Sequence, residues 1–457
     1  MAQNAQYAGE FNLEECKLYS TIKESFADIS DIIISIDINE NIFQSSVEGD
    51  IVVGDANNLI ENMSITGQEY LDLKIATPGA THFEHIIDFT GNRKLYVYDV
   101  ASRQELSAGS QVYTLKVSTI EPLRNQNIRI SKSYTKTISE IVRDIFENTF
   151  QTSKKLFIEK TKSVRRIIVP NNHPFTIINE LKAEAVSEKY DTPHYLFFEN
   201  KHGFHFRSLQ HLMCKEIEHD YKGMVIQKVL HAGDKNLDED KGPKMQGRFD
   251  TTMFQSFMRI KSYAFENLNN WYTNNQRGIL GSTLLTHDIY TKTYKKETFN
   301  YFDNFNKHGL ETKIKPMYDQ KMLNRDFGTF ENTRLFVHPV SRVGTNRTDK
   351  DAQYYKDDKT LYDTSIPEEF ILDRQSKMSE LVGGGISINM VVTGTTDLAA
   401  GDMVHIKLPI VGVNHNKEQF ESSTSGNYLI SHLRHSFIPV TQKHEIHLRA
   451  VKDNKGG

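Results

Sequence analysis

The chain has 457 residues, 38% of them hydrophobic, with 26 Phe and 20 Tyr. At roughly 100 to 200 residues per domain this length predicts three or four domains, and the apolar content is too high for a disordered chain. The net charge of −4 excludes a global positive field that would hold nucleic acid or an anionic membrane, without excluding local basic patches.

The two cysteines, Cys16 and Cys214, are too few for a multi-bridge disulfide framework or a four-thiolate zinc site. They favour maturation in a reducing cytoplasm. The first residues, MAQNAQYAGEF, lack a basic segment followed by an apolar one, and the longest aliphatic run, Ile32 to Ile34, is far shorter than a membrane span. The sequence therefore predicts neither signal-peptide export nor stable membrane insertion.

Residues 32–119 show the period-two alternation of half-buried strands. Turn pairs such as Gly54-Asp55 and Gly91-Asn92 separate the runs, which is typical of an antiparallel sandwich or barrel. Residues 1–125 are therefore predicted to form one all-β domain. Three series carry the alternation: Ile32, Ile34, Ile36 and Ile38; Leu71, Leu73 and Ile75; and Tyr113, Leu115 and Val117.

The pattern changes to helical spacing after Pro122. Ile138 to Phe146 follow one helical face, and Thr137 with Glu140 forms a capping-box pattern at its start. Pro174 predicts the first turn of a second helix. Residues 195–206, with a turn at Gly203, predict an aromatic hairpin. Residues 126–214 are therefore predicted to form a small α+β domain whose amphipathic helices belong to its core.

Strand character returns in a second β unit near the end of the chain, at residues 386–392, 404–408, 428–433 and 444–451. The segment Tyr428 to Leu433, a spacer and Glu445 to Ala450 repeat the pattern of Tyr96 to Val100, a spacer and Val112 to Val117. This likeness favours two related β units, although two hairpins also look alike by chance. Between them, residues 246–370 show mixed periodicity, and the polar run at 342–359 is a candidate mobile loop.

The eighteen histidines raise a metal-site hypothesis. Four pairs share the i, i+3 spacing, which on a strand places the two rings on opposite faces and prevents them from sharing an ion. Ordinary surface or interface histidines are therefore the favoured interpretation. The pairs are His82/His85, His202/His205, His432/His435 and His444/His447.

No other motif predicts chemistry. Gly383-Gly384-Gly385 precedes a strand and lacks the Gly-Lys-Ser/Thr of a phosphate loop, so a strained turn or close backbone packing is expected. The pairs Asp357/Asp358 and Glu368/Glu369 cannot be assigned a catalytic role from the sequence, because the carboxylates of a glycosidase are defined by their separation in space. The sequence therefore predicts no catalytic, cofactor-binding or metal-binding residue and no enzyme, and it assigns no interface residues.

Three stretches spanning most of the chain resemble the central baseplate hub subunit of contractile-tailed, T-even-type phages, a family related to the hub part of contractile injection and type VI secretion spike proteins. Each is a pattern of turn glycines and alternating hydrophobic residues, and their order and spacing carry the resemblance. The first comprises 37–55 and 65–69, the second 168–174, 195–200 and 203–209, and the third 391–408, 426–430 and 444–453.

The resemblance implies a mainly β fold with α+β insertions, in which two barrels like those of tail tube proteins give a homotrimer a pseudo-sixfold ring. The implied domains are 1–125, 126–214, 215–245 with 371–457, and an insertion at 246–370. The implied role joins a hexameric tail tube to a trimeric central spike, starts tube assembly and lines part of the DNA channel without sequence-specific binding. The expected location is the virion baseplate, together with other baseplate proteins, after assembly in the host cytoplasm.

Two alternatives remain open at this point. A tail-associated peptidoglycan hydrolase would need a hydrolase domain, for which only residues 246–370 leave room, and no acid/base, nucleophile or metal constellation is found there. A peripheral receptor-binding protein would use aromatic surface patches to grip host saccharides. The layout of two long β units favours the central position.

Overall fold

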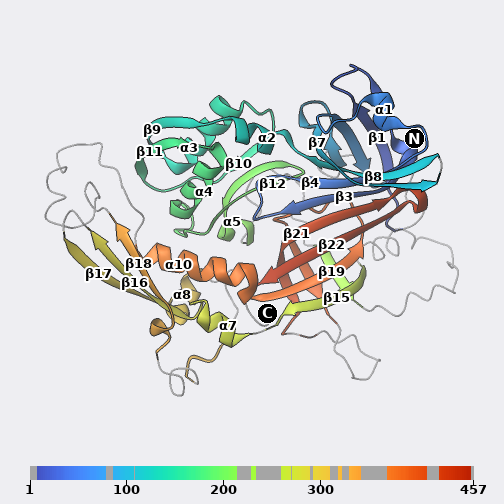
Figure 1. The fold of residues 1–457 in the computed structure, drawn as a ribbon. Coiled ribbons are helices and arrows are strands. Elements are labelled where there is room, and N and C mark those ends of the chain that lie inside the picture. The colour runs from blue at the N-terminus through green and yellow to red at the C-terminus, as the bar shows by residue number, and fades with distance from the viewer. Residues whose placement is uncertain are drawn as a thin grey trace, which may run out of the picture.

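The computed structural model places most of the chain in a mainly β architecture (Figure 1). The polar run at 342–359 lies outside the described residues. Among the described residues, no helix is both long and apolar enough to cross a membrane. The structure describes residues 8–78, 86–107, 109–213, 228–232, 259–268, 270–288, 292–308, 318–321, 329–340, 368–408, 421 and 423–453.

The first β unit is a strongly curved sheet with the strand order β2-β1-β5-β7-β8-β4-β3, and β6 pairs with β5. Its buried face is lined by the alternating hydrophobic residues that the sequence indicated, among them Leu71, Leu73, Tyr113 and Leu115. The elements are β1 (Asn12–Tyr19), β2 (Phe26–Asp28), β3 (Ile33–Asn41), β4 (Glu48–Asp55), α1 (Leu59–Met63), β5 (Tyr70–Ala76), β6 (Ile86–Phe89), β7 (Leu95–Ser107) and β8 (Ser110–Ser118).

The predicted alternation is wrong at the start of β3. Ile33 is buried and Ile34 is 41% exposed, the reverse of what the series Ile32, Ile34, Ile36 predicts. The cause is a register shift between Ile33 and Ser35 in the pairing of β3 with β4. A bulge of this kind adds one residue to one strand, so every residue before it faces the opposite side of the sheet.

The α+β unit follows, and its predicted local features are confirmed. The Thr137–Glu140 capping box is present at the start of α3, and Pro174 begins α4. Helical and strand residues share one core rich in phenylalanine. The elements are α2 (Ile120–Asn127), β9 (Ile130–Thr137), α3 (Ile138–Asp144), η4 (Ile145–Phe150), β10 (Leu156–Ile158), β11 (Val164–Asn172), α4 (Pro174–Glu184), β12 (Tyr195–Asn200), β13 (Gly203–Ser208) and α5 (Leu209–Met213).

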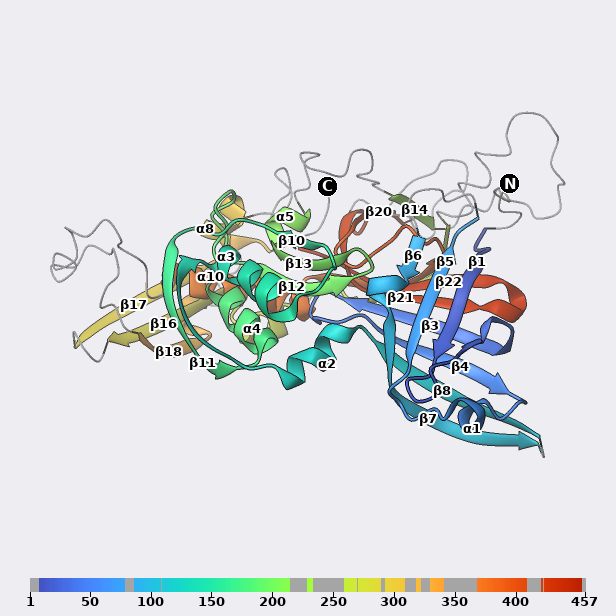
Figure 2. The same ribbon diagram turned by 90° about the horizontal axis from the view of Figure 1, so that it is seen from above.

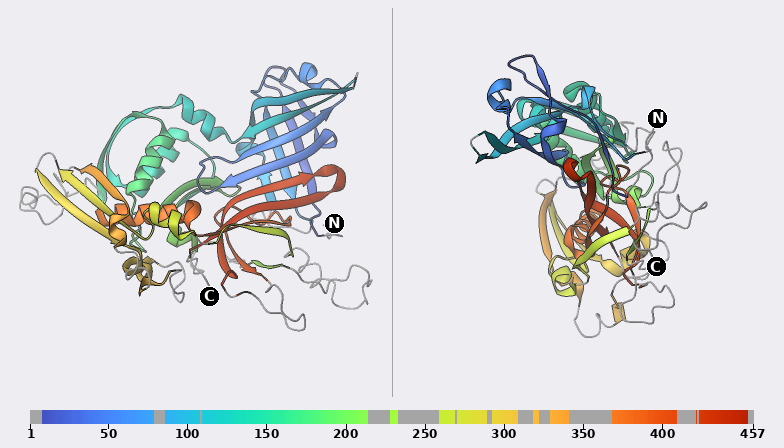
Figure 3. Two further views of the ribbon diagram at one scale, coloured as in Figure 1. Left: turned by 60° about the horizontal axis from the view of Figure 1, so that its bottom comes forward. Right: turned by 90° about the vertical axis from the view of Figure 1, so that its right-hand side faces the viewer.

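The second β unit closes on itself (Figure 3). Its strands pair in the ring β21-β20-β14-β15-β19-β22 and back to β21. The pairings are antiparallel except for β14, which runs parallel to both β20 and β15. The strands are β14 (Lys228–Ala232), β15 (Arg259–Asn267), β19 (Ile386–Thr393), β20 (Met403–Lys407), β21 (Gly426–Ile438) and β22 (Lys443–Lys452).

A smaller α+β unit lies between β15 and β19 in the chain. Its three-stranded sheet, β17-β16-β18, packs on α10 and encloses a core of its own. The division of the chain into domains stays a prediction, but the structure differs from it at one place: β15, assigned above to the inserted segment, pairs with β19 of the second β unit. The elements are α7 (Trp271–Gln276), β16 (Gly281–Asp288), β17 (Thr293–Asn300), α8 (Tyr301–His308), β18 (Leu335–Val340), α10 (Glu368–Ser379) and η7 (Glu380–Gly384).

The two β units form one continuous sheet, because β3 pairs antiparallel with β21 from Ile36 opposite Phe437 to Asn41 opposite His432. Figure 2 shows β3 of the first unit beside β21, with the α+β unit on one side of this seam. The predicted fold class, mainly β with smaller α+β units, is confirmed. The backbone hydrogen bonds of the seam join the two units into one sheet.

Candidate functional site: a buried polar junction

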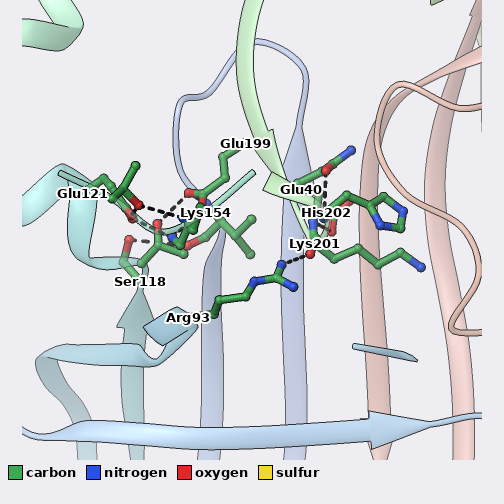
Figure 4. Close-up of polar contacts among 12 residues, drawn as sticks. Glu40, Arg93, Ser118, Glu121, Lys154, Glu199, Lys201 and His202 are labelled. Atoms are coloured by element: carbon green, nitrogen blue, oxygen red, sulfur yellow. Dashed lines mark hydrogen bonds and ion pairs between the residues drawn. The ribbon is translucent and has the colours of Figure 1, made fainter. Parts of the chain in front are cut away.

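A set of buried polar side chains lies where the two β units and the α+β unit meet (Figure 4). We call Glu40, Glu121, Lys154, Glu199 and Lys201 the polar junction. Their elements converge because hairpin β12–β13 extends from the α+β unit to both β units.

This hairpin contacts both β units directly, through its backbone on one side and through a side chain on the other. Glu199 N donates to Gln44 O of the first unit at 3.3 Å, and Asn200 Nδ2 donates to Ala400 O of the second at 3.0 Å. Gly203 allows the close turn, since its φ is +137° and a Cβ there would overlap Lys155 O. The sequence signal for this turn, a glycine between two aromatic runs, therefore has a steric cause.

One half of the polar junction is an ammonium between two carboxylates. Lys154 Nζ donates to Glu121 Oε2 at 2.5 Å and to Glu199 Oε1 at 2.6 Å, and all three side chains are 1 or 2% exposed. Thr152 Oγ1 donates to the second oxygen of Glu121 at 2.6 Å, and Thr119 Oγ1 to that of Glu199 at 2.6 Å. Every carboxylate oxygen therefore has a donor, as buried charges require.

The electrostatics of this half favour a structural role over proton transfer. Burial raises the pKa of Glu199, the charge of Lys154 opposes this rise, and the nearby charge of Glu121 adds to it. A general acid or base needs a free oxygen that a substrate can reach. The oxygens of Glu121 and Glu199 are instead bound to Lys154, Thr119 and Thr152 inside the protein.

The other half centres on Glu40 of β3, which links the two β units. Its Oε1 accepts from Lys201 N at 2.7 Å and its Oε2 from Ala400 N at 2.8 Å. Burial raises the pKa of Glu40 to about 7, although both hydrogen bonds and the charge of Lys201 favour its ionised form. One carboxylate thus joins β3, the β12–β13 turn and the loop before β20.

Further contacts continue this link. Lys201 Nζ donates to Thr396 O, and Arg93 Nη2 donates to Lys201 O. Thr77 N donates to Thr396 Oγ1 at 3.1 Å, and Thr396 N donates to Thr77 Oγ1 at 2.9 Å. Residues separated by hundreds of positions in the chain are therefore joined directly across the two β units.

The structure brings together two histidines from different sequence pairs. His435 and His444 are fully buried rather than exposed at the surface, with His435 Nδ1 and His444 Nε2 3.1 Å apart across β21 and β22. His82 and His85 lie outside the described residues. Among the residues that the structure describes, no three His, Cys, Asp or Glu side chains are grouped to hold a metal ion.

The glycine triplet packs closely, as predicted. A Cβ on Gly385 would lie 2.6 Å from Lys452 O. Of the carboxylate pairs, Glu368 is 3% exposed and accepts from Thr286 Oγ1 and Lys295 Nζ, each at 3.3 Å, inside the smaller α+β unit. Asp357 and Asp358 lie outside the described residues.

Sequence reasoning missed the polar junction. One signal was available: β12 is buried along its whole length, and Glu199 is the single charged residue in that aromatic run. A carboxylate inside a fully buried strand needs a cation, which predicts a partner such as Lys154 without saying which lysine it is.

The fold and the polar junction define a mainly β protein whose units are joined by a shared sheet and by buried hydrogen bonds of Glu40 and Asn200. The chain is similar to a protein of Vibrio phage KVP40 named "Probable baseplate hub protein gp334", with 19% identity over 426 residues that cover 90% of this chain and 88% of the relative. No family model matches the chain. The resemblance to baseplate hub proteins that the sequence motifs indicated is confirmed by this relative.

The chain also matches solved structures of tail proteins. A tail protein of Neisseria meningitidis MC58 has a TM-score of 0.49 and 9% identity, covering 97% of both chains. The 43 kDa tail protein of prophage MuSo2 from Shewanella oneidensis has a TM-score of 0.49 and 10% identity, covering 96% of this chain and 98% of the other.

Proposed function

We propose that this chain is a structural, non-enzymatic hub of a phage tail baseplate. The observation that carries the proposal is the similarity to the Vibrio phage hub protein along 90% of the chain. In this role the protein forms a homotrimer that joins the hexameric tail tube to a trimeric central spike, starts tube assembly and forms part of the DNA ejection channel. Its location is the virion tail, with assembly in the host cytoplasm.

The joined β units support the symmetry of this proposal. A closed ring requires the same contact at every step of its rotation, and two similar units per chain give a trimer six comparable docking positions. These positions stay evenly spaced only when the two units of each chain are rigidly related. The β3–β21 pairing and the carboxylate of Glu40 supply that rigidity.

The test is the mass and the seeding activity of the purified chain. Light scattering should give three times the 52.6 kDa of one chain over a range of concentrations. Added in small amounts to the tail tube subunit, the trimer should shorten the lag of tube polymerisation, and the number of tubes should follow the amount of trimer. Heat-denatured chain is the control.

A chain that stays monomeric and leaves tube polymerisation unchanged would contradict the hub proposal. Clearing of purified cell walls by the chain would favour the hydrolase alternative. Binding to host saccharides without any effect on tubes would favour the receptor-binding alternative.

A further inference from the structure

A cavity of about 410 Å³ lies between the first β unit and the α+β unit. Tyr70, Lys94 and Tyr96 line it from the sheet side, and Arg124 of α2 and Thr152 line it from the other. Its volume is in the range of pockets that hold ligands, and pockets of this kind often lie between domains. Glu121 of its wall belongs to the polar junction, and Thr152 of its wall donates to Glu121.

An aromatic row leads along the sheet surface into this cavity. Phe26, Tyr19, Tyr70 and Tyr96 are direct cross-strand neighbours on β2, β1, β5 and β7. Successive ring centroids are 5.6, 4.8 and 6.2 Å apart, and Phe26 at the outer end is 60% exposed. At roughly 4.8 Å between strands, the row spans about 14 Å, the length of about four extended residues.

The charge presented to a ligand at the inner end of the row is positive. Lys94 Nζ lies 4.1 Å from the ring centroid of Tyr70 and 4.9 Å from that of Tyr19, positions in which the aromatic faces hold the ammonium. Asp72 Oδ2 is 4.0 Å away, a loose ion pair. The carboxylate of Glu121 is taken by internal donors.

Arg124 provides the second cation of the cavity. One of its guanidinium nitrogens donates to Phe150 O at 3.3 Å. A guanidinium carries five N–H donors, so this bond leaves donors that can bind a carboxylate.

We propose that the cavity and the aromatic row bind an extended acidic peptide segment of a partner protein, with a carboxylate on Lys94 and Arg124 and the chain running along the row toward Phe26. A saccharide fits this surface less well, because a sugar ring stacks on an uncovered aromatic face and Lys94 covers the faces of Tyr19 and Tyr70. A compact anion fits less well too, because it would occupy the cavity alone and would not contact the aromatic row. This site does not depend on the hub proposal.

The experiment measures binding of a fluorescein-labelled hexaglutamate peptide to the full chain by anisotropy. The wild-type chain should bind the peptide, with an affinity that falls as salt is raised. Lys94→Gln and Arg124→Gln should each weaken binding about tenfold or more, the effect of losing a hydrogen bond between charged groups. Phe26→Ala should weaken binding of a Glu-Tyr copolymer hexapeptide more than that of hexaglutamate.

The matched control is Lys116→Gln, the same charge change on β8 of the same unit, at a side chain that does not line the cavity. Melting temperatures equal to that of the wild type show that each variant is folded. Absence of peptide binding by the wild type, or equal losses in Lys116→Gln and Lys94→Gln, would overturn the proposal. Equal competition by inorganic phosphate or by glucuronate would replace it with a simple anion site or an acidic-sugar site. Trimer mass and tube seeding are read separately, so failure here leaves the hub proposal intact.

Discussion

Replacing Lys154 with methionine should open hairpin β12–β13 locally. The substitution removes the cation between Glu121 and Glu199 and leaves two carboxylates, each about 1% exposed, without their counter-charge. Removing one partner of a buried pair costs about 3 to 5 kcal/mol. At 1.36 kcal/mol per factor of ten, amide exchange through local opening should become faster by between two and nearly four orders of magnitude.

Hydrogen exchange followed by mass spectrometry, on peptides covering residues 195–208, measures this opening. Lys155→Met is the control, because Lys155 is the exposed neighbour and its ammonium lies 4.8 Å from the centroid of the Phe157 ring. Burial already raises the pKa of Glu199, and without Lys154 it should rise further. The folded state then binds more protons than the unfolded state, so the defect should be larger at pH 8 than at pH 5. Equal exchange in both variants, or a defect independent of pH, would refute this reasoning.

Three further predictions concern other positions. Burial lowers the pKa of His444 well below 6.5, and the charge of His435 lowers it further, so the protein should lose stability as pH falls below about 6.5. The melting temperature should therefore fall less between pH 8 and pH 5 in His444→Phe than in the wild type. An equal fall in both proteins would rule out His444 as the cause. Gly203→Ala should abolish the yield of soluble protein, because a Cβ there would overlap Lys155 O. Gly91 has φ +61° and open space around it, so Gly91→Ala should lower the free energy of unfolding in urea by only about 1 kcal/mol. Similar soluble yields and similar urea midpoints for the two variants would contradict the steric argument. Thr137→Ala should cost about 1 kcal/mol, seen as faster exchange confined to α3; unchanged exchange there would show that the cap contributes nothing.

Local signals in the sequence predicted local structure. The capping box at Thr137, the proline start of α4 and the glycine turn of β12–β13 each depend on residues within a few positions, so their physical cause is contained in the motif. The period-two series predicted the buried face of the first β unit for the same reason. It failed at Ile33 and Ile34, where the partner strand β4 imposes a register shift that no pattern within β3 encodes.

Long-range features could not be predicted. Strand β15 pairs with β14 and β19, and β19 begins more than 100 residues after β15. The mixed periodicity near residue 260 therefore could not show which sheet β15 joins. The polar junction has the same difficulty, because Lys154 is 33 and 45 residues from its two carboxylates and Glu40 is 161 residues from Lys201. Sequence shows that a buried charge needs a partner, and only the tertiary fold selects it.

The fixed relation between the β units depends on two kinds of contact that respond differently to stress. The β3–β21 seam consists of backbone hydrogen bonds, which any sequence of suitable alternation supports and which would allow the strands to slip in register. The carboxylate of Glu40 accepts from Lys201 N of the β12–β13 turn and from Ala400 N of the second β unit. A slip of one residue along the seam would move Ala400 N away and leave one oxygen of this buried carboxylate without that donor. The cost of an unsatisfied buried carboxylate therefore selects one register out of several. In the proposed hub, that choice of register sets the spacing of the two docking units in every chain of the ring.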